Sequence, residues 1–167
     1  MNNFSRRDFL KLTGAGVAAT SALRKDSYHA DTPLTVPRGR TVTTVDLVKL
    51  MLSPTPPILI DVLEGEGHKT LPGAYWIRGP GWYGASEDAN ADTRDRLGYV
   101  LEGLSKGNKA APLTFFCEGY QCWLSYNASL RAHELGYTNV QWYRGGVKAW
   151  EAAKLETLDA VQYGQMR

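Results

Sequence analysis

Three short apolar runs constrain the fold of this chain more than any other feature. They cover residues 58–62, 112–116 and 139–143 and are rich in β-branched and aromatic residues. Runs of this length and composition are typical of strands buried on both faces of a sheet. Segments with helical spacing of apolar residues separate them. Strands that alternate with helices predict an α/β fold, with a parallel central sheet and helices on both faces.

The helices are predicted from apolar spacing and from residues that begin or end a helix. Thr44 is suited to cap the first helix, which carries apolar residues at helical spacing as far as Leu52. Gly136 ends the helix that follows the second apolar run. Two further helices are expected at 93–106 and 147–154, and the long loop over 64–92 contains a short strand at 74–77.

The N-terminus has the pattern of an export signal. The motif SRRDFLK precedes an apolar stretch from Leu12 to Leu23 that is about half as long as a membrane-spanning helix. This pattern predicts twin-arginine export to the periplasm, with no stable membrane insertion after processing. A basic amphipathic helix is the alternative. Small residues suggest cleavage near Ala22 or at Ala30.

Length and charge limit the remaining possibilities. We assign residues 1–30 to the signal peptide, 31–41 to a polar linker and 42–160 to one domain, which suits a chain of 167 residues. The formal net charge is +2, but the first 30 residues are markedly basic and the remainder is near neutral. A near-neutral domain has no basic face for nucleic acid or for an anionic membrane. No cofactor is expected.

The only two cysteines, Cys117 and Cys122, stand at either end of a short polar loop. Cys117 follows a predicted strand and precedes a predicted helix, which places it where parallel sheets bind ligands. The helix N-terminus lowers a thiol pKa, and a loop containing glycine can direct its amides at a sulfur or an anion. Cys117 is therefore a candidate nucleophile, with an anion-binding loop formed by Glu118, Gly119, Tyr120 and Gln121.

Several roles remain open for the pair. Cys117 is either a nucleophile or a buried structural cysteine. Cys122 either forms a structural disulfide with it or acts as the second member of a reactive pair, one attacking and one resolving. The reactive pair is favoured because a disulfide that closes so short a loop stabilises a fold weakly. No metal site is expected, because the three histidines have no ligand-like spacing to the cysteines.

Over nearly all of residues 42–155 the chain resembles a single-domain rhodanese. The resemblance is carried by PILIDV, GHKTLPGAYWI, the strand that ends in Cys117 with its six-residue loop, HELGYTNV and WYRGGVKAW. It implies a sulfurtransferase that carries a persulfide on Cys117, loaded by a small sulfur donor and unloaded by an acceptor thiol. It also implies supporting roles for Asp61, which ties loops together, and for His68, more as a hydrogen-bonded structural residue than as a catalytic acid or base.

Two residues depart from the rhodanese pattern. Glu118 and Cys122 occupy loop places where rhodaneses that use thiosulfate commonly carry basic residues, and a carboxylate there opposes a thiolate and repels a dianion. A thiol/disulfide or binding module with a periplasmic redox protein as partner is therefore the second hypothesis. The run CWLSYNASLRAHELGYTNVQWYRGG is also similar to periplasmic rhodanese-like proteins that have a paired cysteine and tryptophan motif and are associated with PQQ-dependent alcohol catabolism.

Overall fold

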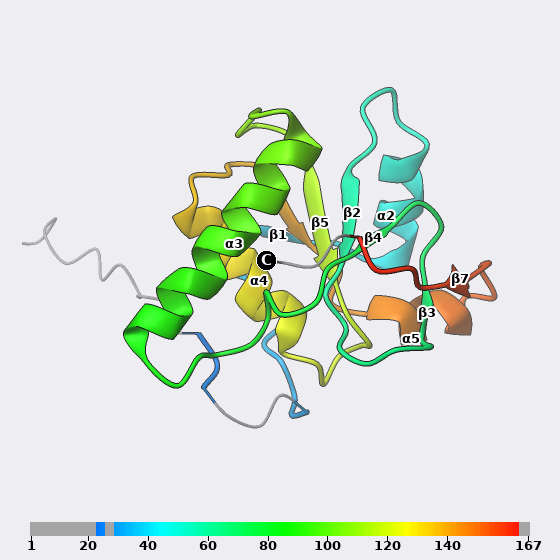
Figure 1. The fold of residues 1–167 in the computed structure, drawn as a ribbon. Coiled ribbons are helices and arrows are strands. Elements are labelled where there is room, and N and C mark those ends of the chain that lie inside the picture. The colour runs from blue at the N-terminus through cyan, green and yellow to red at the C-terminus, as the bar shows by residue number, and fades with distance from the viewer. Residues whose placement is uncertain (1–22, 26–28, 164–167) are drawn as a thin grey trace, which may run out of the picture.

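A computed structural model describes residues 23–25 and 29–163 (Figure 1). Its central sheet has five strands, and every neighbouring pair is parallel. Their spatial order is β1 (Arg40–Thr41), β6 (Val140–Trp142), β5 (Leu113–Phe116), β2 (Ile58–Asp61) and β4 (Tyr75–Trp76). A small antiparallel sheet pairs β3 (Lys69–Thr70) with β7 (Leu158–Asp159). The predicted α/β fold with a parallel central sheet is confirmed.

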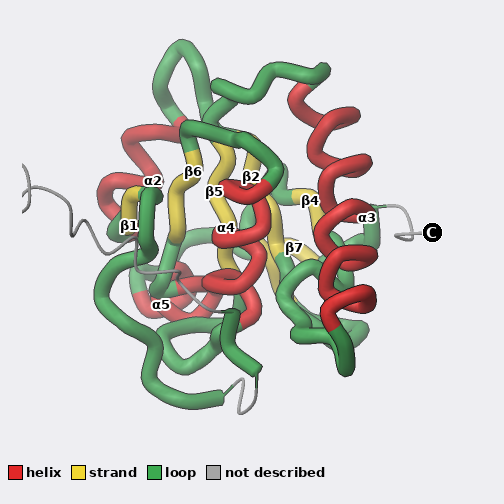
Figure 2. The backbone as a smooth tube through the Cα atoms, turned by 90° about the vertical axis from the view of Figure 1, so that its left-hand side faces the viewer, coloured by secondary structure: helices red, strands yellow, loops and turns green. Residues whose placement is uncertain are grey.

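Helices cover both faces of the sheet (Figure 1). Core contacts place α3 (Glu87–Ser105) and α4 (Leu124–Glu134) on one face, and α2 (Thr44–Met51) and α5 (Gly146–Ala152) on the other. Figure 2 looks onto α4, with the strands behind it. Side chains alternate along β5, so that Phe115 packs under α3 and α4 whereas Phe116 packs under α2 and α5. This alternation decides which face the next residue, Cys117, enters.

Two helices begin elsewhere than predicted. Thr43, not Thr44, caps α2, because the Thr43 hydroxyl accepts from the Asp46 N–H at 3.2 Å and Asp46 accepts in return from the Thr43 N–H at 3.2 Å. Helix α3 begins at Glu87, well before residue 93, because the hydroxyl of Ser86 caps it through the N–H of Ala89. The polar first turns of α3 carry no apolar periodicity, which is why the pattern missed them.

The segment expected to be a linker packs against the domain. Val36 is 3% exposed and lies in a core cluster with Tyr126, Leu130 and Trp142. Arg40 and Thr41 form the edge strand β1. The domain therefore includes residues before 42. The predicted signal peptide falls mostly on residues 1–22, outside the described residues. Within the described part of the chain, no helix is long and apolar enough to cross a membrane.

Candidate active site

The cysteine loop, residues 117–122, follows β5 at the carboxyl edge of the sheet. The start of α5 is seated on it, because the N–H groups of Val147 and Lys148 donate to the carbonyls of Cys117 and Glu118 at 3.0 and 2.9 Å. Gly146 makes this approach possible. Its φ is 56°, and a Cβ atom there would overlap the Cys117 carbonyl oxygen and lie 2.7 Å from the carbonyl carbon of Glu118. The cysteine loop is thus held both by β5, which it follows, and by the start of α5.

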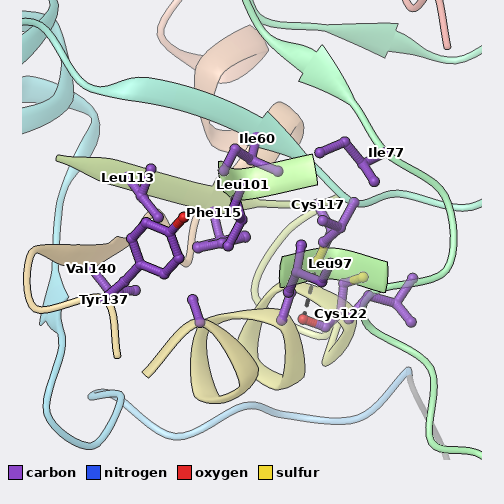
Figure 3. Close-up of a cluster of buried hydrophobic side chains, with 14 residues drawn as sticks. Ile60, Ile77, Leu97, Leu101, Leu113, Phe115, Cys117, Cys122, Tyr137 and Val140 are labelled. Atoms are coloured by element: carbon purple, nitrogen blue, oxygen red, sulfur yellow. Dashed lines mark hydrogen bonds between the residues drawn. The ribbon is translucent and has the colours of Figure 1, made fainter. Parts of the chain in front are cut away.

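Both cysteines are free thiols, and each is 1% exposed. The Cys117 side chain points into the core under α3 and α4, near Leu97 (Figure 3). Its sulfur has the Ser125 hydroxyl at 3.1 Å and the Cys122 carbonyl oxygen at 3.3 Å as hydrogen-bond acceptors. Burial, followed by hydrogen bonding with Cys122, raises the pKa of Cys117 well above its usual value. Cys117 is therefore held as a thiol.

The Cys122 sulfur has the surroundings that the sequence analysis expected for Cys117. Hydrogen bonding by the Cys117 thiol lowers the pKa of Cys122 against the effect of burial, and the backbone N–H groups of Glu118 and Leu124 add to the lowering. Leu124 is the first residue of α4. Cys117 also receives a backbone N–H, that of Ser125 in the first turn of α4, but burial outweighs its effect and the pKa of Cys117 is raised overall. Cys122 is consequently the better thiolate of the pair.

Side chains of the loop contact neighbouring elements. Glu118 is paired with Lys148 at 2.9 Å, and His29 lies 4.0 Å from it. The Glu118 charge still opposes the Cys122 thiolate, but Lys148 compensates much of its repulsion for an anion. Tyr120 is 53% exposed, and Gln121 donates to Asp31 at 2.9 Å. The loop itself contains no basic residue, but Lys148 of α5 places a positive charge beside it.

A strap formed by residues 29–36 lies over the cysteine loop. His29 forms an antiparallel bridge with Cys122. The backbone N–H and the hydroxyl of Thr32 donate to the Tyr120 carbonyl at 3.1 and 2.6 Å. The indole of Trp123 donates to the carbonyl of Ala30 at 2.8 Å. Because the strap and the loop share these bonds, a reagent that attacks either sulfur requires one of them to move.

Arg144, in the segment between β6 and α5, also holds the strap in place. Its guanidinium donates to the Thr32 hydroxyl at 2.9 Å and to the Thr32 carbonyl at 2.8 Å. It also lies over the ring of Tyr120, 4.9 Å from the centroid. Sequence reasoning missed both Arg144 and Thr32, because their contact joins positions far apart in the chain and follows no local pattern.

Ser125 and Trp142 form a buried chain of hydrogen bonds that ends at Cys117. The Trp142 indole donates to the Ser125 hydroxyl oxygen at 2.9 Å, and that oxygen lies 3.1 Å from the Cys117 sulfur. Since the indole can only donate, the Ser125 hydroxyl keeps its own hydrogen available for an ionised Cys117. Sequence reasoning did not identify this chain of hydrogen bonds. Its sequence signal is the serine in the first turn of the helix after the loop.

Asp61 and His68 lie on the opposite face of the sheet from the cysteine side chains. The buried Asp61 carboxylate accepts from Thr70 at 2.6 Å, from His68 at 3.0 Å and from the Leu63 N–H at 2.8 Å. The other ring nitrogen of His68 lies 2.8 Å from the Gly65 carbonyl. Burial lowers the pKa of His68, but Asp61 and Gly65 outweigh it and raise the pKa overall. This geometry is that of a tie between loops.

The described residues contain no group of three or more His, Cys, Asp or Glu side chains that could hold a metal ion.

A family model for the rhodanese-like domain matches residues 44–153, and one for the twin-arginine translocation signal matches residues 3–22. EanB in complex with hercynine is structurally similar, with a TM-score of 0.56 and 18% identity over 72% of this chain and 32% of that chain. Thiosulfate sulfurtransferase from Pseudomonas aeruginosa has a TM-score of 0.51 and 15% identity over 74% and 21%. The chain thus spans about a third or less of these proteins, and at such identities they share its fold. No curated protein matches it.

Proposed function

Because the chain belongs to the rhodanese-like domain family and carries a twin-arginine export signal, we propose that it is a periplasmic sulfurtransferase that carries sulfane sulfur on its cysteine pair. One observation carries the proposal. Two free, hydrogen-bonded thiols lie at the carboxyl end of β5, and backbone amides from the loop and from α4 converge on the sulfur of Cys122.

The transfer has two steps. In the first, the Cys122 thiolate attacks the outer sulfur of a donor such as thiosulfate, and the donor's S–S bond breaks with its electron pair leaving on sulfite. Cys122 then carries a persulfide, and the N–H groups of Glu118 and Leu124 stabilise its charge. In the second step an acceptor thiolate attacks the outer sulfur, becomes a persulfide itself and releases the Cys122 thiolate.

Cys117 acts in this scheme as the neighbouring thiol. Its raised pKa keeps it protonated, and its presence lowers the pKa of the attacking Cys122 sulfur. This assignment differs from the family resemblance, which implies a persulfide on Cys117; in the structure the Ser125 hydroxyl lies 3.1 Å from that sulfur. The two assignments make opposite predictions for the single cysteine variants.

A second candidate function is a thiol/disulfide module, favoured by the closeness of the two cysteines, since the Cys117 thiol donates to the Cys122 carbonyl at 3.3 Å and both thiols are free. Cys117 can attack the inner sulfur of a Cys122 persulfide, which forms the Cys117–Cys122 disulfide and expels hydrosulfide together with the Cys117 proton. The sulfane sulfur is reduced and the two thiols are oxidised. A periplasmic dithiol protein would then have to reduce the disulfide, and the resemblance to PQQ-associated proteins suggests where such a partner acts.

Intact mass tests the proposal. The exported protein is purified without reductant and measured before and after exposure to thiosulfate or polysulfide. We expect a gain of one sulfur atom that persists in Cys117→Ser and disappears in Cys122→Ser. Loss of the gain in Cys117→Ser alone would move the persulfide to Cys117. Loss of two hydrogens without sulfur uptake would overturn sulfur transfer in favour of the thiol/disulfide module.

A further inference from the structure

An open cleft lies at the amino ends of the strands, across the sheet from the cysteine loop. Its volume is about 820 Å³, which is within the range of small-molecule sites. It is bounded by the turn before β1, by the segment after α2 and by the turns that lead into β5 and β6. We call it the arginine cleft, because Arg38 and Arg40 line it.

The two arginines form no close ion pair, although the charge of Arg40 helps to lower the pKa of Asp46. Within residues 23–25 and 29–163 neither guanidinium has a hydrogen-bond or ion-pair partner, and no described residue that lines the cleft is acidic. Arg38 has a φ of 61°, a conformation that residues other than glycine rarely adopt. Gly39 lets this turn lie close to the sheet, since a Cβ atom there would lie 3.1 Å from the carbonyl oxygen of Val140 in β6. The turn therefore presents positive charge from a fixed backbone.

An amide donor lines the same cleft. Strand register places Arg40 beside Gln141 and Gln141 beside Thr114, so the three side chains share one face of the sheet. Thr114 donates to the Gln141 side-chain oxygen at 2.8 Å, which leaves the amide nitrogen as the free end. Gln141 is 4% exposed, and this nitrogen has no hydrogen-bond partner among the described residues. The nitrogen is not among the buried unpaired polar atoms of the described residues, so it is open to solvent at the cleft, where it can donate to a bound acceptor.

From these groups we infer that the arginine cleft binds a small, hydroxyl-rich organic oxyanion. Two guanidinium groups and an amide donor suit the oxygens of a phosphate, sulfate or carboxylate group. The remaining polar lining is neutral and offers hydroxyl and amide groups to a hydroxylated body, from Ser53, Thr55, Thr138 and Asn139. No described lining residue is aromatic, so the cleft has no ring on which a nucleobase could stack. The site is separate from the one that takes up sulfur.

Calorimetric titration of the exported protein tests this inference. The probes are glucose 6-phosphate, citrate and inorganic phosphate, with glucose as the uncharged control. We expect saturable binding of glucose 6-phosphate or citrate, weaker binding of inorganic phosphate and no binding of glucose. The Arg38→Gln/Arg40→Gln double variant should raise Kd by at least about tenfold. Gln141→Glu, which replaces the donor by a carboxylate of the same shape, should raise it by a similar factor.

Two control variants exclude general charge effects and the cysteine site. Arg94→Gln/Arg96→Gln removes the same charge from α3, where both arginines are paired with neighbouring aspartates. It should change Kd by less than about twofold, and so should Cys117→Ser/Cys122→Ser. The inference is overturned if none of the three anions binds saturably, if the α3 variant weakens binding as much as the cleft variant does, or if the cysteine variant abolishes binding.

Discussion

The two ends of the parallel sheet differ in how their polar groups are satisfied. At the carboxyl end the thiols, the loop carbonyls, Glu118 and Arg144 all have partners within the protein, and both sulfurs are 1% exposed. At the amino end two guanidinium groups and the amide nitrogen of Gln141 face an open cleft without partners in the described chain. The carboxyl end therefore needs a movement before it reacts, whereas the amino end is already arranged to accept a ligand.

The largest expected effect is that of Cys122→Ser. It removes the sulfur on which the loop amides converge, so cyanide-dependent thiocyanate formation should fall to background. The matched control is Cys117→Ser, which keeps those amides in place and should still take up one sulfur atom per chain. If thiocyanate formation persists in Cys122→Ser, Cys122 is not the sulfur that attacks the donor.

Gly146→Ala should break the seating of α5 on the cysteine loop. The added methyl group overlaps the Cys117 carbonyl at a positive φ, so we expect a loss of about 3 kcal/mol in the free energy of unfolding. Gly103→Ala in α3 meets nothing within 4 Å and should instead stabilise the protein by about 0.5–1 kcal/mol. Urea denaturation measures both. An equal response to the two substitutions would mean that the close approach at Gly146 is not as described.

Arg144→Gln should loosen the strap without touching the thiols. It removes the charged donor to Thr32, so opening becomes more frequent and alkylation of Cys122 by iodoacetamide should accelerate by about tenfold. Mass spectrometry follows the labelling, with Arg96→Gln on the α3 surface as the control. An unchanged rate would indicate that reagents reach the sulfur by a path that leaves the strap in place.

The smallest expected effect concerns pH. The pKa of His68 is raised in the folded protein, so its contribution to stability is complete below the ordinary value of 6.5 and is lost as the pH rises through the raised value. We expect the unfolding free energy to fall by about 1 kcal/mol across this window, the size of one net hydrogen bond. His68→Gln should abolish this dependence. A wild-type profile that rises over the same window would contradict the tie to Asp61.

The main elements of the fold could be predicted because their signals are local. The runs that became β2, β5 and β6 are continuous and apolar, and the helices between them have clear spacing. Strands β1, β3 and β7 are two residues long and carry no period that a pattern could detect. These short strands form because the tertiary fold places a neighbouring segment where it can hydrogen-bond with them. A local sequence pattern does not contain that information.

The candidate site could be placed from the sequence but not resolved in detail. Cys117 and Cys122 do lie together at the carboxyl end of β5, as expected from their position between a strand and a helix. Which sulfur has the lower pKa depends on burial and on the curl of the loop. The strap depends on contacts between Thr32 and Arg144, which local patterns do not encode. Asp61, which the sequence analysis expected to tie loops together, hydrogen-bonds His68 on the other face of the sheet.

The strap also links maturation to chemistry, because it directly follows the export signal. Cleavage near Ala22 would leave the strap whole, so the mature protein would keep both thiols shielded until the strap is displaced. Cleavage after Ala30 removes His29 and its bridge to Cys122, as well as the carbonyl that anchors Trp123. The position at which a peptidase cleaves the chain would then determine how readily the two thiols react with oxidants after export. The rhodanese-like domain alone would not determine it.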